Sequence, residues 1–577
     1  MIKLNEQIIK TQYSRHIGGE LESVEELINR VVHTISSIEG NYNNDINFYK
    51  VKFKEIIINN YFIPSGRILN NSGSKQSQTA SCFVLPISDD FLSIFDSLKL
   101  AAICHKFGGG TGFNFSKLRE KGAVISSSEA GGASGPVSWI KLFNSETDVV
   151  MSGGKMRGAN MGVLSVYHPD ILEFIKCKGD YGLKNFNISV LIDDDFMHKL
   201  LKNENIQLIS PLNNTFIREE SAQLIWNSII ENIYKTGEPG ILFIDEINRS
   251  NKYGSLVGLL NIANPCGEQI MYENESSFLG SINLLSFYDE TNNDILWKKL
   301  EETIYLGTRF LDNTIDSNKY PSKEIEKISK MYRRIGLGVM GFADLLVKLN
   351  IPYDSNECLT FIDKLGSFFK FHSLNASKAL AEEKGSFSII ENRTDFPLQR
   401  NIAVTAIAPT GTISMVANCS SGIEPKFGHY FNKNVINNEG INYVDQQLLQ
   451  ALMDTNGFNK TEAISLIKHN KFNEYLTDLQ KEVFKFAYNI PPIWHVKVLA
   501  QWQKYIDNGI SKTVNVPSEI GIYELEEVLK MAYESNCKGI TIYRQGSHPK
   551  DLISMNNEIQ IIQSKEKTKL FNELVGN

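Results

Sequence analysis

The stretch Asn264-Pro265-Cys266-Gly267-Glu268 follows the apolar run LeuValGlyLeuLeuAsnIleAla of residues 256–263. A proline and a glycine on either side of one cysteine favour a tight turn that can hold a thiol at a fixed point. The carboxylate two residues later can act as a general base, and the amide two residues earlier can hold a hydroxyl group. Taken alone, the stretch fits an ordinary turn with a buried cysteine better. The rest of the chain decides between these interpretations.

The composition is that of an ordinary globular protein, with 42% hydrophobic and 22% charged residues. A length of 577 residues is more than one ordinary core needs, so we expect several domains or one large elaborated domain. The net charge of -7 argues against a broad nucleic-acid surface, which needs a basic face. Single nucleotides remain possible ligands, because a few backbone amides can hold a phosphate.

The seven cysteines are scattered along the chain, and no two of them form a CxxC pair. This pattern argues against a secreted disulfide scaffold and against a thiolate zinc site. Residues 1–16 lack the apolar region of a signal peptide, and no run approaches about 18 apolar residues. His105, His168 and His495 have no second ligand at metal spacing, so we interpret them as structural. We expect a cytoplasmic protein with reduced thiols and no membrane or metal partner.

The pattern of apolar residues predicts an α/β architecture. Residues 20–60 have helical periodicity, whereas short apolar runs alternate with glycine-rich loops from about residue 80. We expect strands at 187–192, 241–245 and 401–408 and helices from about 194, at 224–234 and over most of 448–489. Strands that alternate with helices over several hundred residues favour one large α/β domain. We therefore divide the chain into a helical region (1–75), a catalytic domain (76–545) and a polar tail (546–577).

Several longer motifs carry a resemblance to a known family. AsnProCysGlyGlu, followed by LeuGlySerIleAsnLeu at 279–284, resembles the finger loop of ribonucleotide reductase catalytic subunits. Further motifs of that family follow in its order over most of the chain: PheIleProSerGlyArgIleLeu (62–69), SerCysPheValLeuPro (81–86), GlyGlyLysMetArgGlyAlaAsnMetGly (153–162), GlyLeuGlyValMetGlyPheAlaAsp (336–344), IleAlaProThrGlyThrIleSer (407–414), SerSerGlyIleGluPro (420–425) and CysLysGlyIleThrIleTyrArg (537–544). So many long motifs in order are not expected by chance.

The resemblance implies a ten-stranded α/β barrel with the finger loop threaded through its centre. Cys266 matches the cysteine whose thiyl radical abstracts hydrogen from the ribose 3′ carbon. Glu268 matches the carboxylate that deprotonates the 3′ hydroxyl, Asn264 the amide that binds it, and Cys82 one member of a reducing cysteine pair. A barrel interior would keep such a radical from solvent and oxygen.

The resemblance also implies binding sites for nucleotides. The loop at 409–414 would bind the phosphates of a ribonucleoside di- or triphosphate, with Ser81, Thr410, Gly411, Thr412 and Ser414 as candidates. Without the family, a plain strand–helix turn would be the better interpretation of that loop. Lys155, Arg157 and Asn160 lie in a motif like the loop that reports a dNTP or ATP effector to the substrate pocket, and Asp90 is a candidate effector contact at a homodimer interface.

Three branches of the family differ in how the cysteine is oxidised. The branch with a separate metal subunit uses two adjacent tyrosines, whereas this chain reads Thr541-Ile542-Tyr543. The glycyl-radical branch carries an RGY-type motif, and none follows residue 537. The motifs at 338–344, 419–425 and 537–544 are most similar to the adenosylcobalamin-dependent branch, class II, whose cofactor supplies the radical.

Ser277 marks a departure from the family pattern. The partner of Cys82 should stand about eleven residues after Cys266, where this chain reads Glu275-Ser276-Ser277-Phe278-Leu279. A serine cannot form a disulfide. The C-terminal cysteine pair that re-reduces the active site in the family is also missing, and the two losses agree with each other.

Three explanations of this departure stay open. An external reductant, such as a small thiol or formate, can replace the missing thiol, or Cys419 or Cys104 can take its place. Alternatively, the scaffold catalyses a nucleotide reaction without net reduction. A need for a separate radical-generating metal subunit is a further alternative. Because Cys266, Glu268, Asn264 and Cys82 are all present, we favour ribonucleotide reduction with an unusual external reductant.

Overall fold

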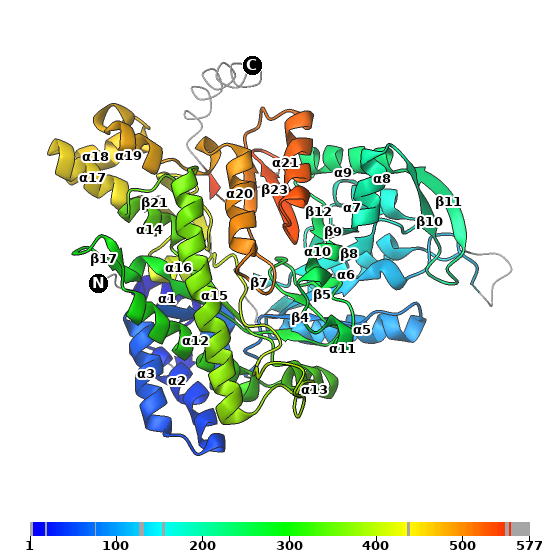
Figure 1. The fold of residues 1–577 in the computed structure, drawn as a ribbon, viewed down its shortest axis with the longest axis horizontal. Helices are drawn as coiled ribbons and strands as arrows, with labels where there is room; N and C mark the ends of the chain where they lie inside the picture. The colour runs from blue at the N-terminus through cyan, green and yellow to red at the C-terminus, as the bar shows by residue number, and fades with distance from the viewer. Residues whose placement is uncertain are drawn as a thin grey trace.

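The computed structural model describes residues 4–17, 20–75, 77–125, 132–152, 156–435, 439–547 and 553–554. A large α/β body carries a helical region formed by the beginning of the chain (Figure 1). One buried apolar cluster runs from Ile8 through the strands to Ile542, so the N-terminal helices share the core of the body. In the described residues, no helix is long and apolar enough to cross a membrane.

The N-terminal region is helical, as the periodicity predicted. Its helices are α1 (Glu6–Gln12), α2 (Val24–Ser36), α3 (Ile46–Ile58) and α4 (Gly66–Asn71), with the short strands β1 (His16–Ile17), β2 (Glu20–Leu21) and β3 (Phe62–Pro64). The helix α2 begins at a capping box, in which Ser23 and Glu26 satisfy each other's free backbone amides. Its apolar face packs against α3 and against α12 (Trp297–Ser317).

Five parallel strands form the first half of the body. In spatial order they are β4 (Cys82–Val84), β5 (Gly110–Asn114), β8 (Asn160–Ser165), β9 (Phe186–Ile192) and β12 (Gly240–Phe243). The main helices along this half are α5 (Phe91–Lys106), α6 (Pro136–Val149), α7 (Ile171–Tyr181), α8 (Asp194–Leu201) and α9 (Ala222–Thr236). These strands are buried along nearly their whole length, as expected of parallel strands covered on both faces.

A second parallel half adds four strands and one bridged segment, so that the ring has ten strand positions. It contains β16 (Leu279–Asn283), β19 (Gly336–Met340), a segment bridged at Thr405 and Ile407, β22 (Thr513–Val516) and β23 (Gly539–Arg544). The two halves meet in antiparallel fashion, where β12 pairs with β23 and where β15 (Ser276–Ser277) pairs with β4. The predicted ten-stranded α/β barrel is confirmed. The helices of this half are α12, α13 (Lys323–Tyr332), α14 (Phe342–Lys348), α15 (Asn356–Lys384), α16 (Ile413–Ala417), α20 (Pro492–Gln503) and α21 (Ile522–Glu534).

The finger loop is a hairpin inside this ring. Its arms are β13 (Ile262–Ala263) and β14 (Ile270–Met271), which pair in antiparallel fashion. A Cβ atom on Gly112 of β5 would lie 2.1 Å from the carbonyl oxygen of Ala263, and one on Gly509 would lie 2.5 Å from that of Gly267. Glycine is therefore required on both sides of the loop, because any side chain there would push the hairpin away from the ring.

The remaining elements lie outside the ring. They are β6 (Met151–Ser152), β7 (Met156–Arg157), β10 (Asn205–Ile209), β11 (Phe216–Ser221), α10 (Ile244–Arg249), α11 (Gly254–Val257), β17 (Tyr288–Asp289), β18 (Asp294–Ile295), β20 (Tyr430–Val435), β21 (Glu439–Val444), α17 (Gln446–Asn456), α18 (Lys460–Lys468), α19 (Asp478–Val483) and β24 (Ile553–Ser554). The helices α17–α19 form a separate lobe at the upper left of Figure 1.

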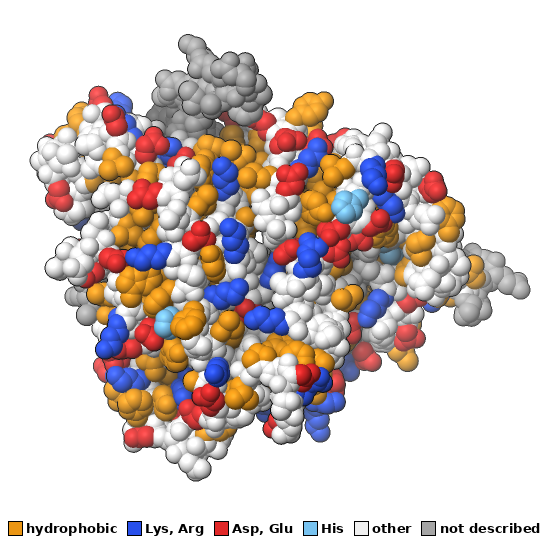
Figure 2. Space-filling view, in the orientation of Figure 1, with side chains coloured by type: hydrophobic (Ala, Val, Ile, Leu, Met, Phe, Trp, Pro, Cys, Tyr) orange, Lys and Arg blue, Asp and Glu red, His pale blue; other side chains and the backbone are white. Residues whose placement is uncertain are grey.

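Most predicted elements are confirmed, with two corrections. The strand predicted at 241–245 ends at Phe243, because Asp245 and Glu246 favour the first turn of α10. The run at 401–408 pairs only through two isolated bridges. The tail predicted from residue 546 lies almost wholly outside the described residues, and the domain limits at 75 and 545 stay predictions. On the face shown in Figure 2, acidic and basic side chains are interspersed.

Candidate active site

The tip of the finger loop is a tight turn held by its own backbone. The amide of Gly267 donates to the carbonyl of Asn264 over 3.0 Å, and Gly267 has a φ of 78° that suits glycine. The side-chain oxygen of Asn264 accepts from the amide of Gln269 at 3.0 Å. Two residues outside the loop bind its backbone. Asn187 donates to the carbonyl of Pro265 at 2.8 Å, and the amide of Gly509 donates to the carbonyl of Glu268 at 3.0 Å. The cysteine between these residues is thus fixed to the ring on two sides.

The four residues expected to carry the chemistry lie together. The side-chain nitrogen of Asn264 lies 3.6 Å from the sulfur of Cys82, and a Cβ on Gly110 would lie 2.8 Å from Pro265 and 3.3 Å from that sulfur. The charges of Glu268 and Cys82 both act on the thiol of Cys266. Sequence positions 82 and 264–268 therefore form one cluster at the centre of the barrel.

Enclosure by protein shifts the pKa of each titratable group in this cluster. Burial raises the pKa of Cys82 to about 12, further helped by the charge of Glu268, and it raises the pKa of Cys266 well above its ordinary value. Burial also raises the pKa of Glu268 to about 7, partly offset by the amide of Asn264. One carboxylate oxygen of Glu268 has no hydrogen-bond partner in the described structure. Both thiols are protonated at neutral pH, and Glu268 is poised to exchange a proton.

Ser277 stands directly opposite Cys82. The two residues are Cα partners where β15 pairs with β4, and the side chain of Ser277 is fully buried with no partner for its hydroxyl among the described residues. Of the two proposed replacements, Cys419 lines the same cavity as Cys266, and the carbonyl of Cys104 accepts from the amide of Gly109 at 2.9 Å. The nearby charges that act on Cys104 and Cys419 are Glu146 and Asp344, not members of the finger-loop cluster. The explanation that another cysteine replaces the missing thiol therefore stays open.

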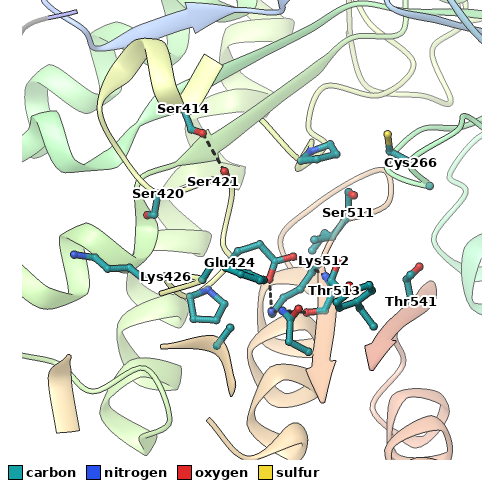
Figure 3. A pocket seen from close by; sticks show the side chains of 18 of the residues that line it. Cys266, Ser414, Ser420, Ser421, Glu424, Lys426, Ser511, Lys512, Thr513 and Thr541 are labelled. Atoms are coloured by element: carbon teal, nitrogen blue, oxygen red, sulfur yellow. Dashed lines mark hydrogen bonds and ion pairs between the residues drawn. The ribbon is translucent and has the colours of Figure 1, made fainter. Parts of the chain in front are cut away.

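A large cavity opens beside Cys266. It has a volume of about 1330 Å³, and the cysteine side chain is exposed to it although protein surrounds the loop. Figure 3 shows Cys266 at one end and Lys512 paired with Glu424 further along the wall, at 2.7 Å. The buried Lys426 pairs with Asp344 and Asp445. Hydroxyl groups line much of the remaining wall: Ser414, Ser420, Ser421, Ser511, Thr513 and Thr541.

The chain matches one family model along most of its length. The model describes the barrel domain of ribonucleotide reductase, and it matches residues 80–395 and 399–543. The chain belongs to the ribonucleotide reductase family. The resemblance seen in the motifs is thereby confirmed.

Among curated relatives of this reductase, a vitamin B12-dependent ribonucleoside-diphosphate reductase of Thermoplasma acidophilum is 41% identical, covering 92% of this chain and 71% of the relative. A protein of the same description from Mycobacterium tuberculosis is 35% identical over 95% of this chain and 80% of its own. These relatives support the predicted class II branch. The alpha subunit of the class Id ribonucleotide reductase of Actinobacillus ureae has a similar fold, with a TM-score of 0.79, 24% identity and coverage of 95% and 98% of the two chains.

The predicted phosphate loop of the reductase precedes the short helix α16. Thr410 has a φ of 53°, and its hydroxyl accepts from the amide of Gly422 at 2.8 Å while its carbonyl accepts from the amide of Ser414 at 2.9 Å. The hydroxyls of Ser414 and Ser421 lie 2.9 Å apart. A Cβ on Gly411 would meet nothing within 4 Å, so open space faces the loop there. Thr412 lies beside the phenol of Tyr13, and Ser81 donates to Ser65 at 3.0 Å.

Two of the four predicted effector contacts of the reductase, Asp90 and Asn160, have side chains that the structure describes. Asp90 caps α5, with its carboxylate accepting from the amide of Ser93 at 3.0 Å. Asn160 is buried on β8 and is hydrogen-bonded to Thr111, Thr147 and the carbonyl of Asn185. Lys155 lies outside the described residues, as does the side chain of Arg157. Asp90 thus has a capping role and Asn160 a structural one, and effector contact stays a prediction.

Sequence reasoning passed over two charged residues that the fold brings to the site. Arg67, within the quoted motif at 62–69, lies near Cys82 and Tyr13. Lys512 is buried in the cavity wall between Glu424 and the ring of His495. His105, His168 and His495 are hydrogen-bonded within the buried structure, as interpreted from the sequence.

We expect the variant Ser277→Cys to form a disulfide with Cys82 under mild oxidation, because directly opposed residues of paired strands bring their Cβ atoms within about 4.5–5.5 Å. Intact-protein and peptide mass spectrometry would detect the loss of two hydrogens and the 82–277 cross-link. The matched control is Ser276→Cys, whose Cα partner is Phe83. A cross-link in the control, or none in Ser277→Cys, would contradict the register.

Proposed function

We propose that this chain is an adenosylcobalamin-dependent ribonucleotide reductase that forms 2′-deoxyribonucleotides through a thiyl radical on Cys266. The observation that carries the proposal is the cluster of Cys266, Glu268, Asn264 and Cys82 inside the barrel, with a large cavity on the exposed side of Cys266. The names of the vitamin B12-dependent relatives support the radical source.

The cavity fits a cobalamin in size and in chemistry. Its volume of about 1330 Å³ far exceeds what an ordinary small ligand needs, and it reaches the sulfur that must be oxidised. Cobalamins carry amide side chains, and the serine and threonine hydroxyls of the wall can donate to and accept from amides. Two buried lysines of the wall are paired with carboxylates of the wall, Lys426 with Asp344 and Lys512 with Glu424, which suits an occupant without strong charge at those places. When bound, adenosylcobalamin supplies a one-electron oxidant by homolysis of its cobalt–carbon bond.

Within the chain, we assign each residue of the cluster one task. Cys266, once oxidised to its thiyl form, takes the hydrogen atom from the ribose 3′ carbon and returns one at the end. Glu268 accepts the proton of the 3′ hydroxyl, which the Asn264 amide holds, and a pKa of about 7 suits that transfer. Cys82 keeps its proton at neutral pH and contributes one reducing equivalent. The enclosure of the loop excludes water from these steps.

The second reducing equivalent must come from outside the cluster. Removal of the 2′ hydroxyl as water consumes two electrons and two protons, and Ser277 cannot share them with Cys82 through a disulfide. We propose a small external donor, a thiol or formate. A thiol would give one electron and one proton, as Cys82 does, and the two sulfurs would end as a mixed disulfide. Formate would supply both electrons as it is oxidised to CO2, and Cys82 would then pass on hydrogen without net oxidation. The wild type would then leave no 82–277 disulfide after turnover. In the reductase with Ser277→Cys, a restored cysteine pair would raise dithiol-driven activity.

An apolar surface on α5 supports the proposal of a homodimer. Phe91 and Leu92 are 64% and 71% exposed, and Phe95 packs its ring against Trp139 of α6. Exposed apolar side chains clustered on two helices mark an interaction surface more often than a free face. Asp90, the candidate effector contact, begins the same helix.

The variant Cys266→Ala tests the radical assignment. With adenosylcobalamin, ribonucleoside di- or triphosphates and either dithiol or formate, supplied without oxygen, we expect the wild type to give a deoxynucleotide identified by mass spectrometry. The variant should lose activity by at least about 10³-fold, because no other group can carry the radical. Activity retained in the variant would exclude the mechanism. An altered but unreduced nucleotide from the wild type would mean a non-reductive reaction, and no product with no cobalt–carbon cleavage would point to a separate radical subunit.

The pH dependence tests Glu268 as the base. Since the carboxylate must be deprotonated to accept a proton, kcat/KM should rise between about pH 6 and 8, around its pKa of about 7. The stability of the fold changes with pH in the opposite direction to the activity. The folded pKa lies above the unfolded value of 4.5, so Glu268 stabilises the fold most below that value, and this contribution is lost as pH rises through about 7. Glu268→Gln should remove both dependences, and a rise that persists in this variant would rule out the assignment.

The variant Leu92→Glu tests the proposed dimer. In a two-fold dimer, each subunit would bury the new carboxylate at the interface, and the free energy of that desolvation would exceed what the remaining contacts supply. Sedimentation should therefore report a monomer for the variant and a dimer for the wild type. Leu201→Glu, at another exposed leucine (66%), is the control that should leave the dimer intact. A monomeric wild type would overturn the proposal.

A further inference from the structure

Arg67 is a cation without an anionic partner. It is half-buried near the start of α4, and its guanidinium makes no hydrogen bond or ion pair with any residue that the structure describes. The acidic groups that act on it are the thiol of Cys82 and the phenol of Tyr13. The pKa of each is raised to about 12, so both are neutral at pH 7. The positive charge is therefore uncompensated.

This state is unusual for the molecule. The buried cations of the described residues have acceptors within the chain. Several are paired with carboxylates, such as Arg333 with Asp312, Arg334 with Glu275, Lys384 with Glu39, Lys426 with Asp445 and Lys512 with Glu424. Lys538 instead donates to the backbone carbonyls of Asp507 and Asn508. Burial of an unpaired cation costs free energy, and burial lowers the pKa of Arg67 accordingly. A cation without any acceptor in the chain, next to a predicted ligand loop, is therefore a candidate for binding an anionic ligand.

The surroundings of Arg67 place it between the reacting cluster and the predicted phosphate loop. Its guanidinium lies against Gly108, where a Cβ would be 2.2 Å away, two residues before the glycine that contacts Cys82. On the other side, the hydroxyl of Tyr13 lies against Gly66, at 2.8 Å from a Cβ there, and beside Thr412. The charge of Arg67 acts on the phenol of Tyr13, which shares a hydrogen bond with the hydroxyl of Thr412, so the three side chains form a continuous polar group with donors for an anion.

We propose that Arg67, Tyr13 and Thr412 form an anion-binding site beside Cys82. The ligand chemistry is a small oxyanion group, because these donors match a phosphate or a carboxylate and the planar guanidinium can bind either with two hydrogen bonds. Two sources fit the position: a phosphate of the nucleotide substrate, and a small carboxylate reductant that delivers electrons next to Cys82. The choice between these sources rests on the proposed reductase function, whereas the site itself does not.

Thermal unfolding of the full chain tests the site without turnover. Inorganic pyrophosphate and formate, each titrated alone, stand for the two sources, and at least one should raise the Tm of the wild type. Arg67→Met should abolish that rise and should be no less stable than wild type without anion, because it removes an unpaired charge. Arg67→Lys should restore part of the rise, and Tyr13→Phe should weaken it. Arg393→Met, which removes an exposed arginine paired with Asp395, is the matched control and should change nothing.

Kinetics then identify the source. If the anion is a phosphate, Arg67→Met should raise KM for the nucleotide roughly ten- to a hundredfold and leave the dependence on formate unchanged. If it is the carboxylate, the dependence on formate should weaken by a similar factor while the nucleotide KM stays constant.

An anion-dependent rise in Tm that survives in Arg67→Met, or a clear loss of stability in that variant, would overturn the inference. Deoxynucleotide formation by the wild type in that case would leave the proposed function standing. Loss of the rise in Arg67→Met, with no deoxynucleotide from the wild type, would support the site and reject the function.

Discussion

The active site depends on the close approach of the finger-loop backbone to the strands of the ring. Gly112 on one side and Gly509 on the other lie so near the loop that a Cβ atom would enter the space of a loop carbonyl. The amide of Gly509 then donates to Glu268, and Asn187 donates to Pro265. A short hairpin with only two paired residues in each arm could not hold its position alone, so the ring fixes where the thiol stands.

The same enclosure sets the chemistry of the site. Removal of water raises the pKa of both thiols and of Glu268, so the cluster holds protonated sulfur beside a carboxyl group that can ionise near neutral pH. Thiols whose pKa is raised in this way stay protonated and are poor nucleophiles and poor metal ligands. They suit hydrogen-atom chemistry, in which the S–H bond itself is the reactant. Only Cys266 also faces the large cavity, and this exposure separates its part from that of Cys82.

The place opposite Cys82 links the two unusual features of this reductase. A serine hydroxyl is buried there without a partner, and an arginine with no counter-charge lies near the same sulfur. In both cases a polar side chain lacks a partner among the described residues of the chain. An anionic group of a reductant or substrate could bind to these side chains, whereas a disulfide partner within the chain could not.

The sequence by itself determined the family, the barrel and the helical N-terminal region, and it singled out Cys266 as the candidate radical cysteine, because these follow from local periodicity and from motifs that are contiguous in the chain. It also located the departure at Ser277, since that position is counted from Cys266. The tertiary structure alone decided which distant residues meet: the pairing of Ser277 with Cys82, the buried networks that occupy Asn160 and Lys512, and the isolation of Arg67. Pairing, burial and charge compensation depend on segments far apart in sequence. No pattern along the chain can show whether a given arginine finds an anion, because its partner would come from another part of the fold.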